Sequence, residues 1–343
     1  MRLKPIREQV VVVTGASSGI GLVTARRFAE AGAAVLLVAR TEATLRDIVM
    51  DIRRRGGRAE YAVADMGDES AVQGVVETAV ARFGGFDTWV NNAGVAIYAR
   101  LDETPTAEHE RMFRTNYWGA VFGSLAAVAH LKAHGGGALI TVGSIAADMG
   151  TPILGAYAAS KHAVKGFIDS LRIEILRDDA PISVTLIKPS GIDTPLAHHA
   201  ANHVGAGLRI PPPVYAPDLV ADAILDAAQH PRREVTVGGI GAAQTVFATH
   251  APALFDSLAG YMEPLLSDPR RSPEPRDNLF EAEGGGRERS GIMWGRPFSL
   301  HATIRNRAPL LAGAGLVAGL ALLASRRSGP RGGASPRLRS RGR

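Results

Sequence analysis

The chain has 343 residues, with 39 Lys and Arg against 33 Asp and Glu and a formal net charge of +6. Its 46% of apolar and 21% of charged residues are typical of a globular protein and exclude a wholly disordered or collagen-like chain. The lack of cysteine excludes a disulfide scaffold, a Cys-ligated zinc site and a thiol nucleophile. The positive charge lies at the C-terminus, where residues 326–343 hold seven arginines and no acidic residue, so the rest of the chain is nearly neutral.

Strand and helix patterns alternate over the first 240 residues. The predicted strands are 10–14, 34–39, 58–64, 86–91, 138–143, 182–188 and 234–237. The predicted helices are 20–31, 42–55, 69–83, 107–134, 155–177 and 218–229. Apolar strands separated by helices indicate a parallel sheet that is covered on both faces. We therefore expect an α/β fold, a Rossmann-type doubly wound parallel sheet of about seven strands flanked by helices, followed by a C-terminal extension.

Composition divides the remainder of the chain. We expect one domain over 1–266, with its core at about 8–240 and a further helical segment at 242–266. Residues 267–307 are rich in Pro, Gly and charge, which predicts a linker or a loosely packed extension. Residues 308–325 are apolar, and 326–343 form an Arg-rich tail that cannot build a core.

The apolar segment is at the lower length limit for a membrane-spanning helix. Its residues 308–324 are seventeen uncharged residues in a row, with Gly315 and Gly319 at a spacing that permits close helix packing in a membrane. A buried or subunit-contacting helix and a disordered tail are the alternatives. The Arg-rich tail would favour the cytoplasmic side and anionic lipid. No secretory signal is visible, so we expect a cytoplasmic protein whose membrane contact, if any, is through its C-terminus. Nucleic acid is not expected as a partner, because no aromatic residues interleave with the arginines.

A glycine-rich turn joins the first predicted strand to the first helix, over 14–21. Gly15 permits the tight turn, Gly19 lets the backbone approach a pyrophosphate, and Gly21 lets helix and strand pack closely. The helix N-terminus offers free N–H donors to phosphate. In this context the turn predicts a dinucleotide site, and an ordinary strand–helix turn is the alternative.

The end of the second strand bears on the choice of cofactor. A carboxylate there would accept hydrogen bonds from the ribose hydroxyl of NAD, but the strand ends in Ala39-Arg40. The guanidinium of Arg40 suits the 2′-phosphate of NADP. We therefore expect NADP(H) rather than NAD(H), and the alternative is a solvated Arg in an Arg-rich chain.

Ser144 follows the strand predicted at 138–143, and Tyr157 and Lys161 lie one turn apart in the next helix. A tyrosine with its ordinary pKa of about 10 is a poor base at neutral pH, and a nearby ammonium lowers that pKa by favouring the phenolate. Ser144 lies at a strand's carboxyl end, where open α/β sheets bind their ligands, and can hold a substrate oxygen. Alone, Tyr-x-x-x-Lys is equally well explained as a solvated helix face.

Together these motifs resemble the short-chain dehydrogenase/reductase family, over about residues 8–240. An Asn-Asn-Ala-Gly motif stands at 91–94, and 189–194 resembles the family's Pro-Gly-x-Val-x-Thr segment with Ser190 and Ile192 substituted. The resemblance implies a catalytic tetrad, which is Asn116, Ser144, Tyr157 and Lys161. It also implies a set of cofactor-binding residues, which are Gly15, Ser17, Ser18, Gly19, Ile20, Gly21, Arg40, Asp65, Met66, Asn92, Ala93, Gly94, Tyr157, Lys161, Pro189, Ile192 and Thr194.

The resemblance implies a reaction as well. In reduction, NADPH delivers hydride to a carbonyl carbon while Tyr157 donates a proton to its oxygen, and alcohol oxidation is the reverse. Ser144 orients that oxygen, Lys161 binds the nicotinamide ribose and lowers the Tyr157 pKa, and Asn116 supports a proton relay. A homodimer or homotetramer is implied through the helices that carry Asn116 and Tyr157. The competing hypothesis is a catalytically idle NADP(H)-binding scaffold or redox sensor, against which the intact tetrad argues.

The segment between Pro195 and Pro217 is where the family carries a substrate-covering loop. It is apolar and His-rich without clustered charge, which favours a small carbonyl or alcohol substrate of apolar character. His198, His199 and His203 have a metal-like spacing, but no Asp or Glu completes a motif and the implied reaction needs no metal. We expect no metal site; pocket lining and a solvated loop are the alternatives.

Overall fold

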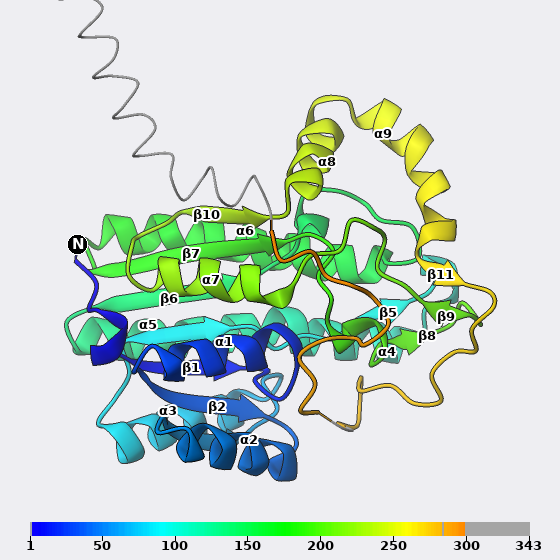
Figure 1. The fold of residues 1–343 in the computed structure, drawn as a ribbon. Coiled ribbons are helices and arrows are strands. Elements are labelled where there is room, and N and C mark those ends of the chain that lie inside the picture. Colours follow the sequence, from blue (N-terminus) through cyan, green and yellow to red (C-terminus); the bar gives the residue numbers. More distant parts are fainter. Residues whose placement is uncertain (1, 283–284, 299–343) are drawn as a thin grey trace, which may run out of the picture. The chain divides into compact units, whose positions relative to one another are not determined.

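The computed structural model describes residues 2–282 and 285–298, and within them seven strands form one sheet, in the order β10-β7-β6-β4-β1-β2-β3 (Figure 1). All of its strand pairs are parallel. The strands are β1 (Val10–Thr14), β2 (Ala34–Ala39), β3 (Arg58–Val63), β4 (Thr88–Asn91), β6 (Gly137–Val142), β7 (Ile182–Pro189) and β10 (Glu234–Val237). The predicted Rossmann-type sheet is confirmed.

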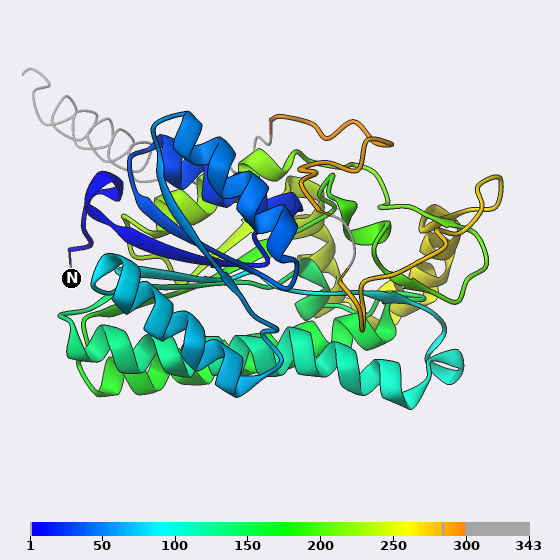
Figure 2. The ribbon, with the colours of Figure 1, turned by 90° about the horizontal axis from the view of Figure 1, so that it is seen from below.

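Helices cover both faces of the sheet, and Figure 2 shows the two layers with the strands between them. On one face lie α1 (Gly19–Glu30), α2 (Glu42–Arg54) and α7 (Pro217–Ala227), and on the other α3 (Glu69–Phe83), α5 (Gly119–Ala133) and α6 (Gly155–Arg177). Val11 and Val13 pack into the first layer, whereas Val12 between them packs into the second. Successive side chains of a strand point to opposite faces of the sheet, and helices cover both faces here. Both sets of side chains are therefore buried, which explains why the strands are apolar throughout.

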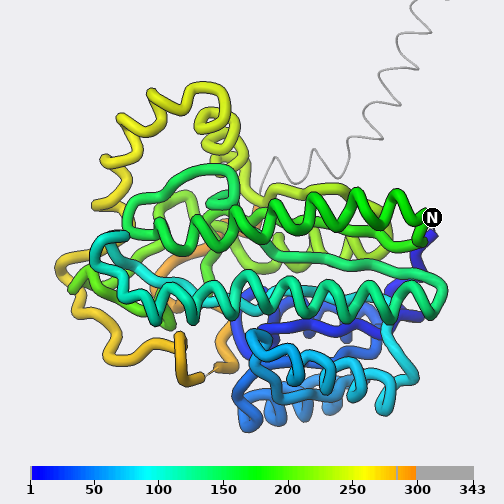
Figure 3. The backbone as a smooth tube through the Cα atoms, turned by 180° about the vertical axis from the view of Figure 1, so that it is seen from behind, coloured from blue at the N-terminus to red at the C-terminus, as the bar shows by residue number. Residues whose placement is uncertain are grey.

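The long helix predicted at 107–134 is interrupted in the structure. It consists of α4 (Thr106–Phe113), a π-helical turn η3 (Arg114–Trp118) and α5, which continue one another across the back of the sheet (Figure 3). The π-helical turn surrounds Asn116, whose amide is bonded inward to the backbone of Val95. Such bulges occur where a side chain takes a special position at a functional site.

The helical segment predicted at 242–266 is also divided. It forms α8 (Gly239–His250), α9 (Pro252–Ala259) and the 3-10 helix η6 (Gly260–Leu265). Pro252 begins α9 and Pro264 lies in η6, so prolines mark both breaks because they remove backbone donors. The remaining short elements are η1 (Ile6–Glu8), β5 (Ile97–Tyr98), η2 (Leu101–Glu103), η4 (Ile145–Ala147), η5 (Pro195–Ala197), β8 (Ala201–Asn202), β9 (Gly207–Leu208) and β11 (Ser267–Asp268).

The described part of the predicted linker packs on the domain. β11 pairs antiparallel with β9, Leu279 is buried, and Arg296 bridges to Tyr215. Residues 267–282 and 285–298 therefore belong to the same compact unit as the sheet, whereas the sequence led us to expect a loose extension. The apolar segment 308–325 and the tail 326–343 lie outside the described residues, and the predictions for them stay predictions. Among the described helices none is long and apolar enough to cross a membrane.

Candidate active site

Three of the four predicted catalytic side chains line one cavity of about 320 Å³ at the carboxyl edge of the sheet. Ser144 lies two residues after the end of β6 and caps η4, since its Oγ accepts a hydrogen bond from the Ala146 N–H at 3.1 Å. Tyr157 and Lys161 come from successive turns of α6. Because β6 ends where α6 begins its pass over the sheet, the three groups meet although the chain separates them.

Asn116 lies behind this group. Its side-chain oxygen accepts from the Val95 N–H at 2.8 Å, and its amide donates to the Val95 carbonyl and to Ser160 Oγ, each at 3.0 Å. It shares a second, smaller cavity with Lys161 and does not line the large one. Asn116 therefore ties Val95, two residues before β5, to Ser160 of α6, the residue before Lys161.

Burial determines the proton affinities of the site. Burial raises the pKa of Tyr157 to about 12, opposed by its hydrogen bond with Ser144. Burial lowers the pKa of Lys161 to about 8, and its ammonium donates to the Val142 carbonyl at 3.1 Å. The sequence predicts a lowered Tyr157 pKa, and the structure shows the opposite direction. The reason is that the phenolate would lose its hydration while the lysine, 5.7 Å from the ring centroid, is itself desolvated.

The same cavity continues over the glycine turn to the end of β2. All but one of the predicted cofactor-binding residues line it: Gly15, Ser17, Ser18, Gly19, Ile20, Arg40, Asp65, Met66, Asn92, Ala93, Gly94, Tyr157, Lys161, Pro189, Ile192 and Thr194. The exception is Gly21, where a Cβ would lie 2.2 Å from the Gly15 carbonyl oxygen. Gly21 is therefore required for close packing, as predicted. Gly15 and Gly19 have φ of +65° and +52°, a left-handed conformation that favours glycine.

Two groups near the β2 end of the cavity were missed by sequence reasoning. They are Arg111 and the backbone of the C-terminal extension. Arg111 on α4 donates to Asp65 at 2.6 Å. Burial alone would raise the pKa of Asp65, but the hydrogen bond from Arg111 and the Gly67 amide lower it below its ordinary value. Arg40 donates to backbone carbonyls of the C-terminal extension. Neither Arg111 nor the C-terminal extension belongs to a local motif, so no sequence signal pointed to these contacts.

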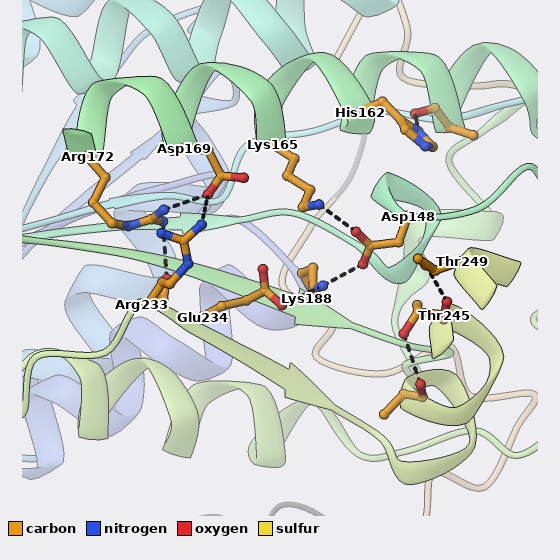
Figure 4. A network of polar contacts seen from close by, with 12 residues as sticks. Asp148, His162, Lys165, Asp169, Arg172, Lys188, Arg233, Glu234, Thr245 and Thr249 are labelled. Atoms are coloured by element: carbon orange, nitrogen blue, oxygen red, sulfur yellow. Dashed lines mark hydrogen bonds and ion pairs between the residues drawn. The ribbon is translucent and has the colours of Figure 1, made fainter. Parts of the chain in front are cut away.

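A buried ion-pair network anchors the loop that begins at Ser144 (Figure 4). Asp148, which follows η4, pairs with Lys188 of β7 and, at 2.9 Å, with Lys165 of α6. Lys188 also pairs with Glu234 of β10 at 2.6 Å. The side chains of Lys188 and Asp148 are only 7% and 10% exposed. The chain has just five lysines, so their scarcity was the one available hint that Lys165 and Lys188 have specific partners.

The three histidines of the predicted covering loop separate. His198 bonds to Glu274 and His203 to Glu108, each at 2.8 Å, while His199 lines the cavity. Within the described part of the chain, no group of three metal-ligating side chains gathers.

Apolar side chains form the wall next to Tyr157. It packs with Tyr98, Leu154, Leu196 and Ile210 in one cluster. The cavity is further lined by Met149, Pro211, Pro212, Pro213, Ile240, Met262 and Leu266, with Gln244 and His199 as polar side chains. Sequence reasoning located the 195–217 part of this wall but missed the part from α8 and η6, because those helices carry no motif.

Comparison with known proteins extends over most of the chain. A sequence model of the family described as short chain dehydrogenase matches residues 9–204. The uncharacterized oxidoreductase YxnA of Bacillus subtilis is 40% identical over 325 residues, covering 93% of this chain and 91% of that protein. Dehydrogenase/reductase SDR family member 7B of Xenopus laevis is 30% identical, covering 74% of this chain and 81% of that protein. The crystal structure of L-sorbose reductase from Gluconobacter frateurii, complexed with NADPH and L-sorbose, has a TM-score of 0.59 at 26% identity, covering 67% of this chain and 94% of that one.

We expect Asp148→Asn to destabilise the protein at neutral pH and to flatten its acid unfolding. Burial would raise the pKa of Asp148, but hydrogen bonds from Lys188 and Lys165 lower it. A lowered folded pKa adds stability above the unfolded pKa, and that stability is lost as pH falls through the folded value. Urea unfolding at pH 7 should show a loss of about 3 kcal/mol for the variant, shrinking toward pH 3.

Asp178→Asn is the matched control, because its pair with Lys132 lies on the surface, with side chains 52% and 41% exposed. It should leave unfolding almost unchanged. A loss for Asp148→Asn that is equally large at pH 3 and pH 7 would mean that the charge of Asp148 is not what stabilises this loop.

Proposed function

The chain belongs to the short-chain dehydrogenase/reductase family of NAD(P)-dependent oxidoreductases, and on this premise we propose that it transfers hydride between NADP(H) and a carbonyl or secondary alcohol, with Tyr157 as general acid and base. One observation carries the proposal. A single cavity joins the glycine turn after β1 to Ser144, Tyr157 and Lys161. A dinucleotide lying along it would bring its nicotinamide end to the catalytic side chains.

The residues of the cleft fit such a cofactor. The N-terminus of α1 and two left-handed glycines form one wall, and the 92–94 backbone forms another. The residue directly after β2 is Arg40 and not a carboxylate, and its guanidinium suits a 2′-phosphate. NADPH is also the cofactor in the crystal structure of the related L-sorbose reductase. These features support NADP(H) over NAD(H).

The cofactor, when bound, supplies or accepts the hydride. In reduction Tyr157 is protonated at neutral pH, because burial raises its pKa to about 12, and it donates this proton to the carbonyl oxygen. The Ser144 hydroxyl holds the same oxygen. Lys161 has two protons beyond the one that bonds the Val142 carbonyl, and these serve the hydroxyls of the nicotinamide ribose. Asn116 holds the backbone around Val95 against α6.

The substrate that fits the apolar wall is an apolar carbonyl compound or the corresponding alcohol. The apolar cluster that packs with Tyr157 contains no ionisable group other than tyrosine, among the described residues. The charged side chains that line the described cavity, Arg40, Asp65 and Lys161, belong to the proposed cofactor site. Gln244 and His199 provide the polar contacts by which one further substrate group could be recognised.

We also propose a homo-oligomer through α5 and α6, which lie on the face turned to the viewer in Figure 3. Both helices expose large apolar side chains, with Leu125 at 51%, Ile173 at 65% and Leu176 at 72%. Exposed apolar surface of this kind marks contacts between proteins.

Leu125→Glu tests the oligomer, because a carboxylate buried in a contact between copies would be desolvated without a partner. Sedimentation should show the variant dissociated under conditions in which the wild type is a dimer or tetramer. Leu254→Glu, on the exposed face of α9, is the matched control and should keep the wild-type mass. A wild type that is monomeric at micromolar concentration would reject the proposal.

Tyr157→Phe tests the catalytic assignment. Removal of the hydroxyl should lower the turnover number about a thousandfold, because the acid is lost, and should leave NADPH binding within about twofold. Turnover is measured as NADPH oxidation with a panel of apolar ketones and aldehydes, and binding by NADPH fluorescence.

Tyr98→Phe is its control, since this buried tyrosine lines the same cavity and should retain most activity. Near-normal turnover by Tyr157→Phe would refute the assignment. A wild type that binds NADPH but reduces no carbonyl would favour the idle scaffold.

The two reaction directions should depend oppositely on pH. The pKa of Lys161 lies at about 8, so its ammonium is charged below that pH and neutral above it. Carbonyl reduction should be steady at neutral pH and fall above pH 8, because the neutral amine no longer stabilises the phenolate that proton donation leaves on Tyr157. Alcohol oxidation needs Tyr157 without its proton beside a charged Lys161, so it should rise up to about pH 8 and level off above it. Initial rates in both directions, measured at pH values below and above 8, test this dependence. Lys161→Arg should show no decline near pH 8 in whatever activity it keeps, because a guanidinium stays charged.

A further inference from the structure

The C-terminal extension crosses the proposed cofactor cleft. We call the described residues 277–282 and 285–288 the strap. In Figure 1 this yellow-to-orange part of the chain runs past the carboxyl ends of the strands. Asn278 begins the crossing by donating its N–H to the His199 carbonyl at 2.9 Å, and Asn278 and Ala282 both line the cavity.

The first crossing point is Arg40. Its guanidinium donates to three consecutive strap carbonyls, those of Asn278, Leu279 at 3.4 Å and Phe280 at 3.2 Å. These are the donors that the proposed function assigns to the 2′-phosphate of NADP(H). Carbonyl oxygens of the strap thus accept from the same donors that phosphate oxygens would need.

The second crossing point is the glycine turn. The N–H of Gly19, the first residue of α1, donates to the Arg287 carbonyl at 2.9 Å, and Gly286 donates to the Ser17 carbonyl at 2.7 Å. The N–H groups of a helix's first turn have no partner within the helix and are the ones that bind phosphate. Here too a strap carbonyl, that of Arg287, accepts from a donor, the Gly19 N–H, that could bind a phosphate of the cofactor.

Side chains fix the strap in this position. Leu279 is 1% exposed and packs with Val95, Ile97 and Met112, while Arg111 Nε donates to its carbonyl at 2.9 Å. The Glu288 carboxylate pairs with Arg26 of α1. The match to YxnA covers 93% of the chain, so it reaches past the strap whichever end holds the unmatched residues.

We propose that the strap is a built-in competitor for the phosphates of NADP(H). When it is closed, its carbonyls hold the Arg40 and Gly19 donors; when it opens, those donors become available to the 2′-phosphate and the pyrophosphate. This proposal rests on the proposed cofactor site. Both cofactors carry the pyrophosphate and only NADP(H) carries the 2′-phosphate, so the 278–280 part of the strap determines cofactor preference and the 286–288 part determines affinity for both.

The test compares cofactor dissociation constants, measured by fluorescence titration on the full chain. Leu279→Ala loosens the part of the strap at Arg40 and should bind NADPH about tenfold more tightly, because a smaller fraction of the protein is closed. Its affinity for NADH should change by less than about twofold, because NADH has no 2′-phosphate to use the Arg40 donors that this part of the strap releases. Phe280→Ala is the matched control, since its side chain is 55% exposed, and should bind both cofactors as the wild type does.

A double mutant locates the effect. In an Arg40→Ala background Leu279→Ala should no longer tighten NADPH binding, because the contested donor is absent. Unchanged or weaker NADPH binding by folded Leu279→Ala would overturn the proposal, since the strap would then be neutral or would clamp bound cofactor.

Glu288→Gln provides a second variant should loss of Leu279 prevent folding. It frees the part of the strap at the glycine turn, so NADPH and NADH should both bind about twofold to threefold more tightly. Unchanged constants for both cofactors would overturn the proposal. If neither wild type nor any variant bound either cofactor, the proposed function itself would fail, which is a different outcome from wild-type binding that the strap variants do not alter.

Discussion

Each of the seven strands pairs in parallel with its neighbours, so every strand delivers the residue that follows it to the same edge of the sheet. The glycine turn comes after β1, Arg40 after β2, Asn92 after β4 and Ser144 after β6. These residues are far apart in the chain, and only the shared strand direction makes them walls of one cavity. The parallel sheet in turn requires helices on both faces, and one of them, α6, carries Tyr157 to the same edge.

Burial of the side chains at this edge shifts their pKa values and so determines what they can do chemically. Two lysines are buried there, and the fold treats them differently. Lys188 has two carboxylate partners, Asp148 and Glu234, and this pairing fixes the loop after Ser144. Lys161 donates to a backbone carbonyl, and burial lowers its pKa to about 8. With this one hydrogen bond Lys161 keeps two protons to offer to a ligand, whereas two of the three protons of Lys188 are directed at carboxylates.

The sheet could be predicted from the sequence because its determinants are local. Apolar runs of strand length and helical spacing located all seven strands, and the motifs marked residues that line the cavity. The misses depend on contacts between distant parts of the chain. The π-helical turn at Asn116 follows from bonds to Val95, and the position of the strap follows from Leu279 entering a distant apolar cluster. The direction of the Tyr157 pKa was missed for the same reason, since burial cannot be read from i, i+4 spacing. The break at Pro252 is an exception, because the proline that causes it is a local signal.

Hydrogen-bond donors that bind the phosphates of a cofactor are left without a partner whenever the cofactor leaves. The N–H groups at the start of α1 and the guanidinium of Arg40 lie in a partly buried cleft, where an unmade hydrogen bond is costly. Carbonyls of the strap accept from Arg40 and from the Gly19 N–H, the first of α1, at 3.4 Å or less. A neutral carbonyl is the weaker acceptor, since hydrogen bonds to an ionised oxygen are roughly twice as strong. In our proposal the phosphates of the cofactor therefore displace the strap, which keeps the donors bonded between turnovers, so the same segment protects the cleft and yields it to its ligand.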